Sequence, residues 1–421
     1  MTLLESVLAL DQWLETMKQP QGYAGPVAHW WQACYQYVGP GLDWRYEGIL
    51  AGYQRLWDLS RDERWRRRID EAVGHLIAGQ RPDGSYRNSR FEDNPGVLGT
   101  PHEAAATLGL LHVCRTATHP DLRYAVVKSL NHLIDCLWDK PSQGFNDAPG
   151  VLGRVPNKLA TLAEVLMAGA EWLGEESWLA YARSALDDIV RFQVKAGRYQ
   201  GAVHQWATGP ALTGDGRFFP YYIARCVPAL VEGARIFHAP SYREAAELIG
   251  DFLLRTRHDD GSWPQLLYQH GGGVEYPHWV APLADILYAL WCLGRPLPAA
   301  SLAYLRQGQL PSGGFVTAEG FCARFDGRRR PARSYLDVTP VVGWNDKVLR
   351  LLTALLSDRP EGWPRVPIAD EATVVPVWVD QEVGQFRETP EAMAIGGKRG
   401  LAFFWEKKAS WAVLRGEVMV R

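Results

Sequence analysis

A proline that opens an apolar run of helix length recurs at nearly regular intervals along this 421-residue chain. The prolines are Pro101, Pro156, Pro220, Pro277 and Pro340. Proline is favoured at the first helical position because its missing N–H would have no partner there. Self-similarity at a nearly fixed spacing is the signature of a repeated supersecondary unit. The chain is therefore expected to fold as a set of similar helical repeats.

Each repeat is expected to contain one helix that is apolar on nearly all sides and a second helix with a charged face. The apolar helices are expected at 44–58, 101–117, 156–173, 220–237, 277–293 and 340–356. The first five are followed by amphipathic partners, for example at 62–80 and 241–257. A helix without a polar face has to be buried on every side, so the first helices should form an inner layer and the second helices an outer one.

The two ends of the chain complete this pattern. The sixth inner helix lacks an outer partner after residue 357, whereas 3–17 is an amphipathic helix without a partner. We expect this N-terminal helix to pack beside the sixth inner helix and close the ring. The predicted fold class is all-α, an (α/α)6 toroid of six helical hairpins over residues 1–358. Residues 359–421, rich in Val, Phe and Trp, are expected to form a small β-rich C-terminal extension that could mediate oligomerisation.

Composition excludes several classes of function. A formal net charge of -2 gives no reason to expect binding to nucleic acid. No stretch reaches the roughly 20 apolar residues of a membrane span, and the N-terminus lacks the features of a signal peptide, so a cytoplasmic protein is expected. The six cysteines form no CxxC pair, and no metal-ligating or nucleotide-binding motif is present, so neither a metal nor a cofactor is expected. The 18 Trp, 17 Tyr and 13 Phe suit either wide helix crossings or a cleft for sugars or hydrocarbons.

The residues that follow the prolines are expected to meet at one end of the toroid. Repeats two and three share the frame Phe…Asp…Pro-Gly-Val-Leu-Gly…Pro, in which His102-Glu103 of one repeat becomes Asn157-Lys158 of the other. A frame that served packing alone would need neither these side chains nor their divergence. Because helix N-termini carry partial positive charge, a pocket built from them favours an anionic ligand.

The candidate site follows from this placement. The catalytic candidates are Glu103, Asp346, His102, Tyr222 and His278. The candidates for substrate binding are Trp44, Tyr46, Glu47, Asn157, Lys158, Tyr221, Arg225, Trp279, Trp344 and Lys347. Purely structural roles are open for several of them. Glu47 and Glu103 could complement their own helix dipoles, Asp346 and Lys347 could be a neutralised buried pair, and His278 could belong to the core.

The helix pattern over residues 40–357, for example 46–80 closing on Pro82-Asp-Gly-Ser-Tyr86, resembles the six-hairpin (α/α)6 enzymes. The resemblance implies a carbohydrate-active enzyme of the glycoside hydrolase or polysaccharide lyase class, since that superfamily contains unsaturated-glucuronyl hydrolases, other glycosidases, lyases and sugar epimerases. The same closing phrase is similar to repeats of isoprenoid cyclases and protein prenyltransferases. The acidic DxDD proton donor of those cyclases and the Asp/Cys/His zinc set of the transferases are absent from the sequence.

Cleavage of a glycosidic bond in an acidic, uronate-containing oligosaccharide is the expected reaction. Hydrolysis needs two carboxyl groups on either side of the bond, one of them protonated. Glu103 is the expected acid, with Asp346 or Glu47 as the base.

Three alternatives stay open. In a uronate lyase or epimerase, Asn157, Lys158 and Arg225 would neutralise the carboxylate, while Tyr222, or His102 or His278, abstracted the α-proton. An isoprenoid cyclase or prenyltransferase-like enzyme is the second alternative, and a non-catalytic helical-repeat binding protein is the third. A scaffold of that kind predicts a flat or filled toroid mouth, whereas an enzyme predicts a deep pocket lined by aromatic side chains.

Overall fold

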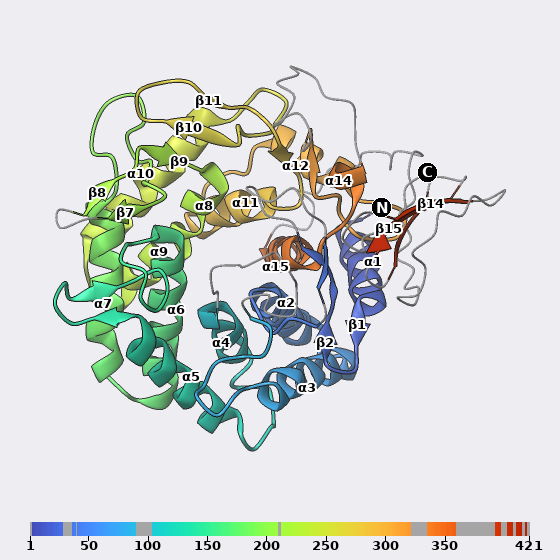
Figure 1. Ribbon diagram of the computed structural model, residues 1–421, viewed down its shortest axis with the longest axis horizontal. Coiled ribbons are helices and arrows are strands. Elements are labelled where there is room, and N and C mark those ends of the chain that lie inside the picture. The colour runs from blue at the N-terminus through green and yellow to red at the C-terminus, as the bar shows by residue number, and fades with distance from the viewer. Residues whose placement is uncertain are drawn as a thin grey trace.

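The computed structural model describes residues 2–27, 36–38, 40–89, 103–208, 212–320 and 335–358, with four strands between 392 and 418. Its helices form two concentric layers (Figure 1). The inner helices are α2 (Arg45–Ser60), α4 (Glu103–His112), α6 (Pro156–Leu173), α8 (Pro220–Ala224) continued by α9 (Cys226–Ile236), α11 (Leu283–Cys292) and α15 (Val342–Asp358). The outer helices are α1 (Leu3–Thr16), α3 (Glu63–Ala78), α5 (Leu122–Leu137), α7 (Ser177–Arg191), α10 (Pro240–Thr256) and α12 (Ala299–Gln307). The predicted (α/α)6 toroid is confirmed.

Burial explains why the two layers differ in sequence. The inner helix α6 buries every residue from Pro156 to Ala163, so all of its faces are covered. Its outer neighbour α7 buries Trp178, Ala182, Ala185, Leu186 and Ile189, which recur at helical spacing on one face. An apolar stripe of that width covers the inner layer, while the opposite face of the helix meets water.

A similar turn after three of the outer helices, α3, α7 and α12, contacts the next outer helix of the ring. The side-chain amides of Gln80, Gln193 and Gln309 each donate to a carbonyl within their own turn. Each also donates to a carbonyl of the following outer helix, at Ala125 of α5, Ala245 of α10 and Ser6 of α1. The helix α1 therefore stands in the ring as α5 and α10 do, beside the inner helix α15.

A glycine in two of these turns packs closely against the backbone of the next outer helix. A Cβ on Gly84 would overlap the carbonyl oxygen of Lys128, three residues after Ala125. A Cβ on Gly313 would overlap the carbonyl oxygen of Ala9, three residues after Ser6. Both glycines have positive φ, a conformation that L-residues adopt at a cost. The contact between α1 and the turn after α12 thus repeats the geometry of the contact between α5 and the turn after α3, although its two sides lie far apart in the sequence.

Short antiparallel strands fill the connections between helices. They are β1 (Lys18–Gln19) with β2 (Gly22–Tyr23), β3 (Gly25–Val27) with β4 (Gln36–Val38), β5 (Trp138–Asp139) with β6 (Gly144–Phe145), β7 (Ala207–Thr208) with β8 (Thr213–Gly214), β9 (Arg217–Phe218) with β10 (Leu266–Tyr268) and β11 (Gly273–Val274), and β12 (His278–Trp279) with β13 (Ala318–Glu319). A short helix, α14 (Tyr335–Val338), precedes α15. Near the C-terminus, β14 (Ala392–Gly396), β15 (Ala402–Glu406), β16 (Ser410–Leu414) and β17 (Glu417–Val418) form one antiparallel sheet. The division of the chain into domains at residue 358 stays a prediction.

One predicted helix start is wrong. The proline pattern predicts a fifth inner helix from Pro277, but His278 and Trp279 lie in β12 and pair with Glu319 and Ala318. The helix begins only at Leu283, with Pro282 as its N-cap residue. The pairing joins segments on either side of α11 and α12, so the local proline signal could not reveal it. None of the helices in the described ranges has the length and hydropathy needed to cross a bilayer.

Candidate functional site

A cavity of about 220 Å³ opens at the end of the toroid where the inner helices begin. We call it the toroid cavity. Every inner helix position contributes to it, since α2, α4, α6, α8, α11 and α15 each supply a lining residue close to their N-termini. Its walls comprise Trp44, Glu47, Ala105, Asp147, Val155, Asn157, Lys158, Thr161, Gln205, Trp206, Arg217, Tyr221, Tyr222, Arg225, Asp285, Trp344 and Lys347. Side chains from segments far apart in the sequence therefore face one space.

Many of the residues selected from the sequence meet in this cavity. They are Trp44, Glu47, Asn157, Lys158, Tyr221, Tyr222, Arg225, Trp344 and Lys347. They come together because residues at the start of each inner helix lie on the same end of the ring. Their roles in binding or catalysis stay predictions.

Other candidates lie elsewhere. Tyr46 is fully buried against Tyr23, whose backbone N–H lies 3.4 Å from the Tyr46 hydroxyl. Asp346 is fully buried in the packing of α15 against α2, where it accepts a 3.1 Å hydrogen bond from the backbone N–H of Gly48. His278 bonds to Glu275 outside the cavity lining.

Trp279 supports the cavity wall from behind. Its ring lies 5.7 Å from that of Tyr221 and 5.9 Å from that of Trp344, and both of these line the cavity. His102 lies outside the described residues, and Glu103 is described only as the first residue of α4. Two residues further along that helix, Ala105 lines the cavity.

A buried carboxylate, Glu47, organises the floor of the cavity. It accepts a hydrogen bond from Lys347 Nζ at 3.1 Å and lies 3.1 Å from Arg225 Nη1, while Arg350 Nη1 also contacts it. Burial alone would raise the pKa of Glu47, but the charges of Arg225, Lys347 and Arg350 outweigh burial and hold this pKa well below its usual range. Glu47 therefore stays ionised and is unsuited to take a proton from water.

A second set of paired charges adjoins Glu47. Arg350 Nη2 donates to Asp285 at 2.6 Å, and its guanidinium lies 4.3 Å from the ring centre of Tyr288. Asp346 pairs with Lys347 at 2.8 Å, and burial raises the pKa of Asp346 to about 7 against the attraction of Lys347. Because Asp346 has no exposed surface, this shift describes its burial rather than contact with a substrate.

The wall formed by α6 carries a different ion pair. Lys158 Nζ contacts the carboxylate of Asp147, which lies in the loop before α6. Unlike Glu47, Asp147 has only this cation as a partner among the described ion pairs. Asp147 is not among the residues expected from the helix starts, although it is the aspartate of the frame shared by repeats two and three. The recurrence of this aspartate in both repeats is the sequence signal that points to it.

Further lining residues come from loops that have no helical period. Trp206 precedes β7, and Arg217 begins β9, where its guanidinium pairs with Asp215 at 2.6 Å. The side-chain oxygen of Asn157 and the indole N–H of Trp344 are buried and have no hydrogen-bond partner among the described residues. Because buried polar groups are normally paired, these two atoms suit hydrogen bonds to a ligand.

Taken over the lining, the cavity offers aromatic faces and positive charge. Trp44, Trp206, Tyr221, Tyr222 and Trp344 supply the rings. The cations Lys158, Arg217, Arg225 and Lys347 face the carboxylates Glu47, Asp147 and Asp285. The N-termini of α6 and α8, each opened by a proline, add partial positive charge at the same place.

No protein-family model matches the sequence, and a search of curated proteins finds no match. Solved structures with the same fold include an unsaturated glucuronyl hydrolase specific for heparin (TM-score 0.61, 11% identity, 84% of this chain and 96% of that one). Others are the cellobiose 2-epimerase of Bacillus thermoamylovorans B4167 (0.60, 10%, 84% and 98%) and a D-mannose isomerase (0.60, 12%, 83% and 96%). At these identities the likeness concerns the fold, which is that of the six-hairpin glycosidase-like (α/α)6 enzymes.

Proposed function

We propose that the protein is a carbohydrate-active enzyme that hydrolyses a glycosidic bond in an acidic, uronate-containing oligosaccharide. The observation that carries this proposal is the toroid cavity, where aromatic rings and four cationic side chains face one space. Aromatic faces suit the apolar C–H surfaces of sugar rings, and fixed cations suit a carboxylate. Among proteins of this fold, the heparin-specific unsaturated glucuronyl hydrolase is named for such a substrate.

Asp147 is the carboxylate best placed to act as the base. Its ion pair with Lys158 involves the ionised form, and it lines the cavity without the cage of cations that surrounds Glu47. As the base, Asp147 would take a proton from the water that attacks the anomeric carbon. Asp147 replaces Asp346 and Glu47 in that role, because Asp346 has no exposed surface and Glu47 is held ionised.

Glu103 remains the proposed acid that protonates the departing sugar oxygen. It is the first residue of α4, two positions before Ala105, which lines the cavity. At the start of another inner helix, α6, the residues Asn157 and Lys158 line the cavity. The pair Glu103 and Asp147 would then approach the bond from two different repeats, as acid/base hydrolysis requires.

Elimination by a uronate lyase is less well supported by the same cavity. It requires a base for the α-proton, and Tyr222, the expected base, lines the cavity together with Lys158 and Arg225. Burial raises the pKa of Tyr222 far above its ordinary value, which makes its phenolate costly to form. His278, the other base described, bonds to Glu275 outside the lining. These two observations favour hydrolysis over elimination.

The test is an incubation with oligosaccharides that end in an unsaturated uronate, followed by absorbance of the conjugated alkene and chromatography of the products. Hydrolysis of the terminal unsaturated sugar lowers the absorbance. A lyase acting on saturated uronate chains raises it instead. The proposal is wrong if the absorbance stays unchanged and the chromatogram shows no new sugar with either uronate or neutral oligosaccharides.

A further inference from the structure

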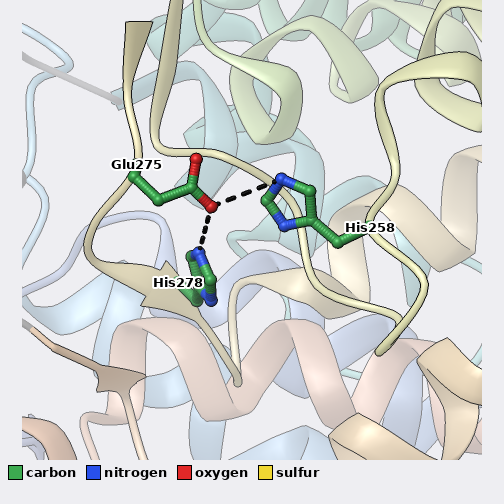
Figure 2. Close-up of side chains that lie close together, drawn as sticks. All are labelled: His258, Glu275 and His278. Carbon is green, nitrogen blue, oxygen red and sulfur yellow. Dashed lines mark hydrogen bonds and ion pairs between the residues drawn. The ribbon is translucent and has the colours of Figure 1, made fainter. Parts of the chain in front are cut away.

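Three potential metal ligands converge outside the toroid cavity. His258, Glu275 and His278 point toward one another, as Figure 2 shows. Nε2 of His278 lies 2.8 Å from Oε1 of Glu275, and Nε2 of His258 lies 3.3 Å from the same oxygen. One potential ligand atom from each of the three side chains lies within 4.8 Å of the other two. Two imidazoles and a carboxylate sharing one point are a donor set typical of zinc.

The three residues come from separate segments that the fold brings together. His258 lies in the turn after α10, Glu275 follows β11, and His278 begins β12. His278 is fixed by the pairing of β12 with β13 and is buried, whereas Glu275 is 54% exposed. The site is therefore rigid on one side and open to water on the other. An ion bound there could keep water in a remaining position.

A second layer of hydrogen bonds selects the state of His258 that can bind a metal. The hydroxyl of Ser262 donates its single proton to Asp260 at 2.7 Å. Ser262 Oγ lies 3.0 Å from Nδ1 of His258, so that contact requires Nδ1–H of the imidazole as the donor. In the neutral ring the lone pair then sits on Nε2, which is the atom facing Glu275. Outer-shell partners of this kind orient metal-bound histidines in general.

This tautomer brings two electron-rich atoms close together at the centre of the cluster. Nε2 of His258 and the carboxylate oxygen of Glu275 lie 3.3 Å apart, and a proton or a metal ion between these two atoms would satisfy both. Ligand atoms bound tetrahedrally at zinc distances lie about 3.3 Å apart. The two separations from Glu275, 3.3 Å and 2.8 Å, need only a small opening to admit an ion.

We propose that His258, Glu275 and His278 bind one Zn²⁺ ion through the two Nε2 atoms and the Glu275 carboxylate. The ion would link the turn after α10 to β12. That strand carries Trp279, whose ring supports Tyr221 and Trp344 in the cavity wall. The site is thus placed to hold this wall in position, and it modifies the sequence-based expectation that no metal binds.

The experiment is a titration of the chelator-treated full chain with Zn²⁺, followed by calorimetry, and with Co²⁺, followed by its visible absorption. His258→Gln and Glu275→Gln are the test variants, because both side chains are partly exposed and their loss leaves the core intact. His119→Gln is the matched control, since His119 has nearly the same exposure, 32% against 33%, and also lies beside a carboxylate, Asp121. Circular dichroism establishes that each variant is folded.

We expect one ion per chain, with the intense visible bands of four-coordinate Co²⁺. The affinity should fall at least about tenfold in each test variant and stay unchanged in the control. Binding that survives in both His258→Gln and Glu275→Gln would overturn the proposal, because the ion would then sit elsewhere. A chain that binds no Zn²⁺ in the millimolar range would overturn it too, leaving the cluster as a pair of histidine–carboxylate hydrogen bonds.

Discussion

At the scale of single residues, Asp147 and Glu47 differ in what surrounds them. Asp147 meets one lysine at the cavity wall, and Glu47 is enclosed by two arginines and a lysine. If Asp147 is the base, Asp147→Asn should lower kcat by roughly 10²–10⁴-fold with little change in KM, since the amide cannot take a proton. Steady-state rates on the oligosaccharide identified as substrate check this.

The control for that variant is Asp188→Asn. Asp188 also pairs with a buried cation, Arg154 at 3.0 Å, but it lies on the outer helix α7 away from the cavity lining. Its kcat should match that of the unmodified protein. Equal rates for Asp147→Asn and Asp188→Asn would show that Asp147 only holds Lys158 in place.

Glu47 should matter for stability more than a surface glutamate does. Glu47→Gln keeps the shape of the side chain but leaves Arg225, Lys347 and Arg350 buried without their shared anion. Breaking a buried ion pair in this way costs about 3–5 kcal/mol, measured as the free energy of unfolding in urea. Glu232→Gln, in the exposed pair with Arg235, should cost less than about 1 kcal/mol. Similar losses for the two variants would mean that water reaches the floor.

At the scale of elements, the contact between α1 and the turn after α12 closes the ring. A side chain at Gly313 would meet the carbonyl of Ala9 and would also adopt a positive φ. Gly294→Ala measures the cost of positive φ alone, because Gly294 has positive φ with open space around it. We expect Gly294→Ala to cost about 1–2 kcal/mol. Gly313→Ala should cost clearly more and expose Trp13, which red-shifts its fluorescence.

Only part of the fold and of the candidate site can be predicted from the sequence. The inner and outer helices are predictable because their burial imposes periods on the sequence, apolar all round or on one face. Residues such as Lys158 and Trp344 follow from their place at helix starts. Trp206 and Arg217 lie in connections whose sequence has no period, so nothing local reveals them. His278 is misassigned by the local pattern because the pairing of β12 with β13 is non-local.

At the scale of the whole molecule, a polar network runs through the middle of the toroid. It begins at the cavity floor with Lys347 and Glu47 and passes through Arg350. It continues to Arg55, which donates to the carbonyl of Arg350 at 3.1 Å and to the hydroxyl of Tyr288 at 2.9 Å. The charged side chains that continue from the cavity floor are therefore paired with one another.

Protonation of Glu164, which contacts this network, makes the stability of the protein depend on pH. It lies 3.4 Å from Arg225, and burial raises its pKa from 4.5 to about 7 despite the attraction of that arginine. Between about pH 5 and 7 the folded protein therefore holds a proton that the unfolded chain releases. The stabilisation from that proton is complete at low pH and is lost as the pH rises through the folded pKa.

Glu164→Gln separates this effect from every other titration, because the amide imitates the protonated acid at all pH values. Relative to the variant, the unmodified protein should lose roughly 1–3 kcal/mol of unfolding free energy between pH 5 and pH 8. Urea unfolding of both proteins at the two pH values gives the double difference, in which groups such as His112 cancel. A double difference of zero, or of opposite sign, would mean that Arg225 outweighs burial, so that Glu164 stays ionised and the polar network carries one more negative charge at neutral pH.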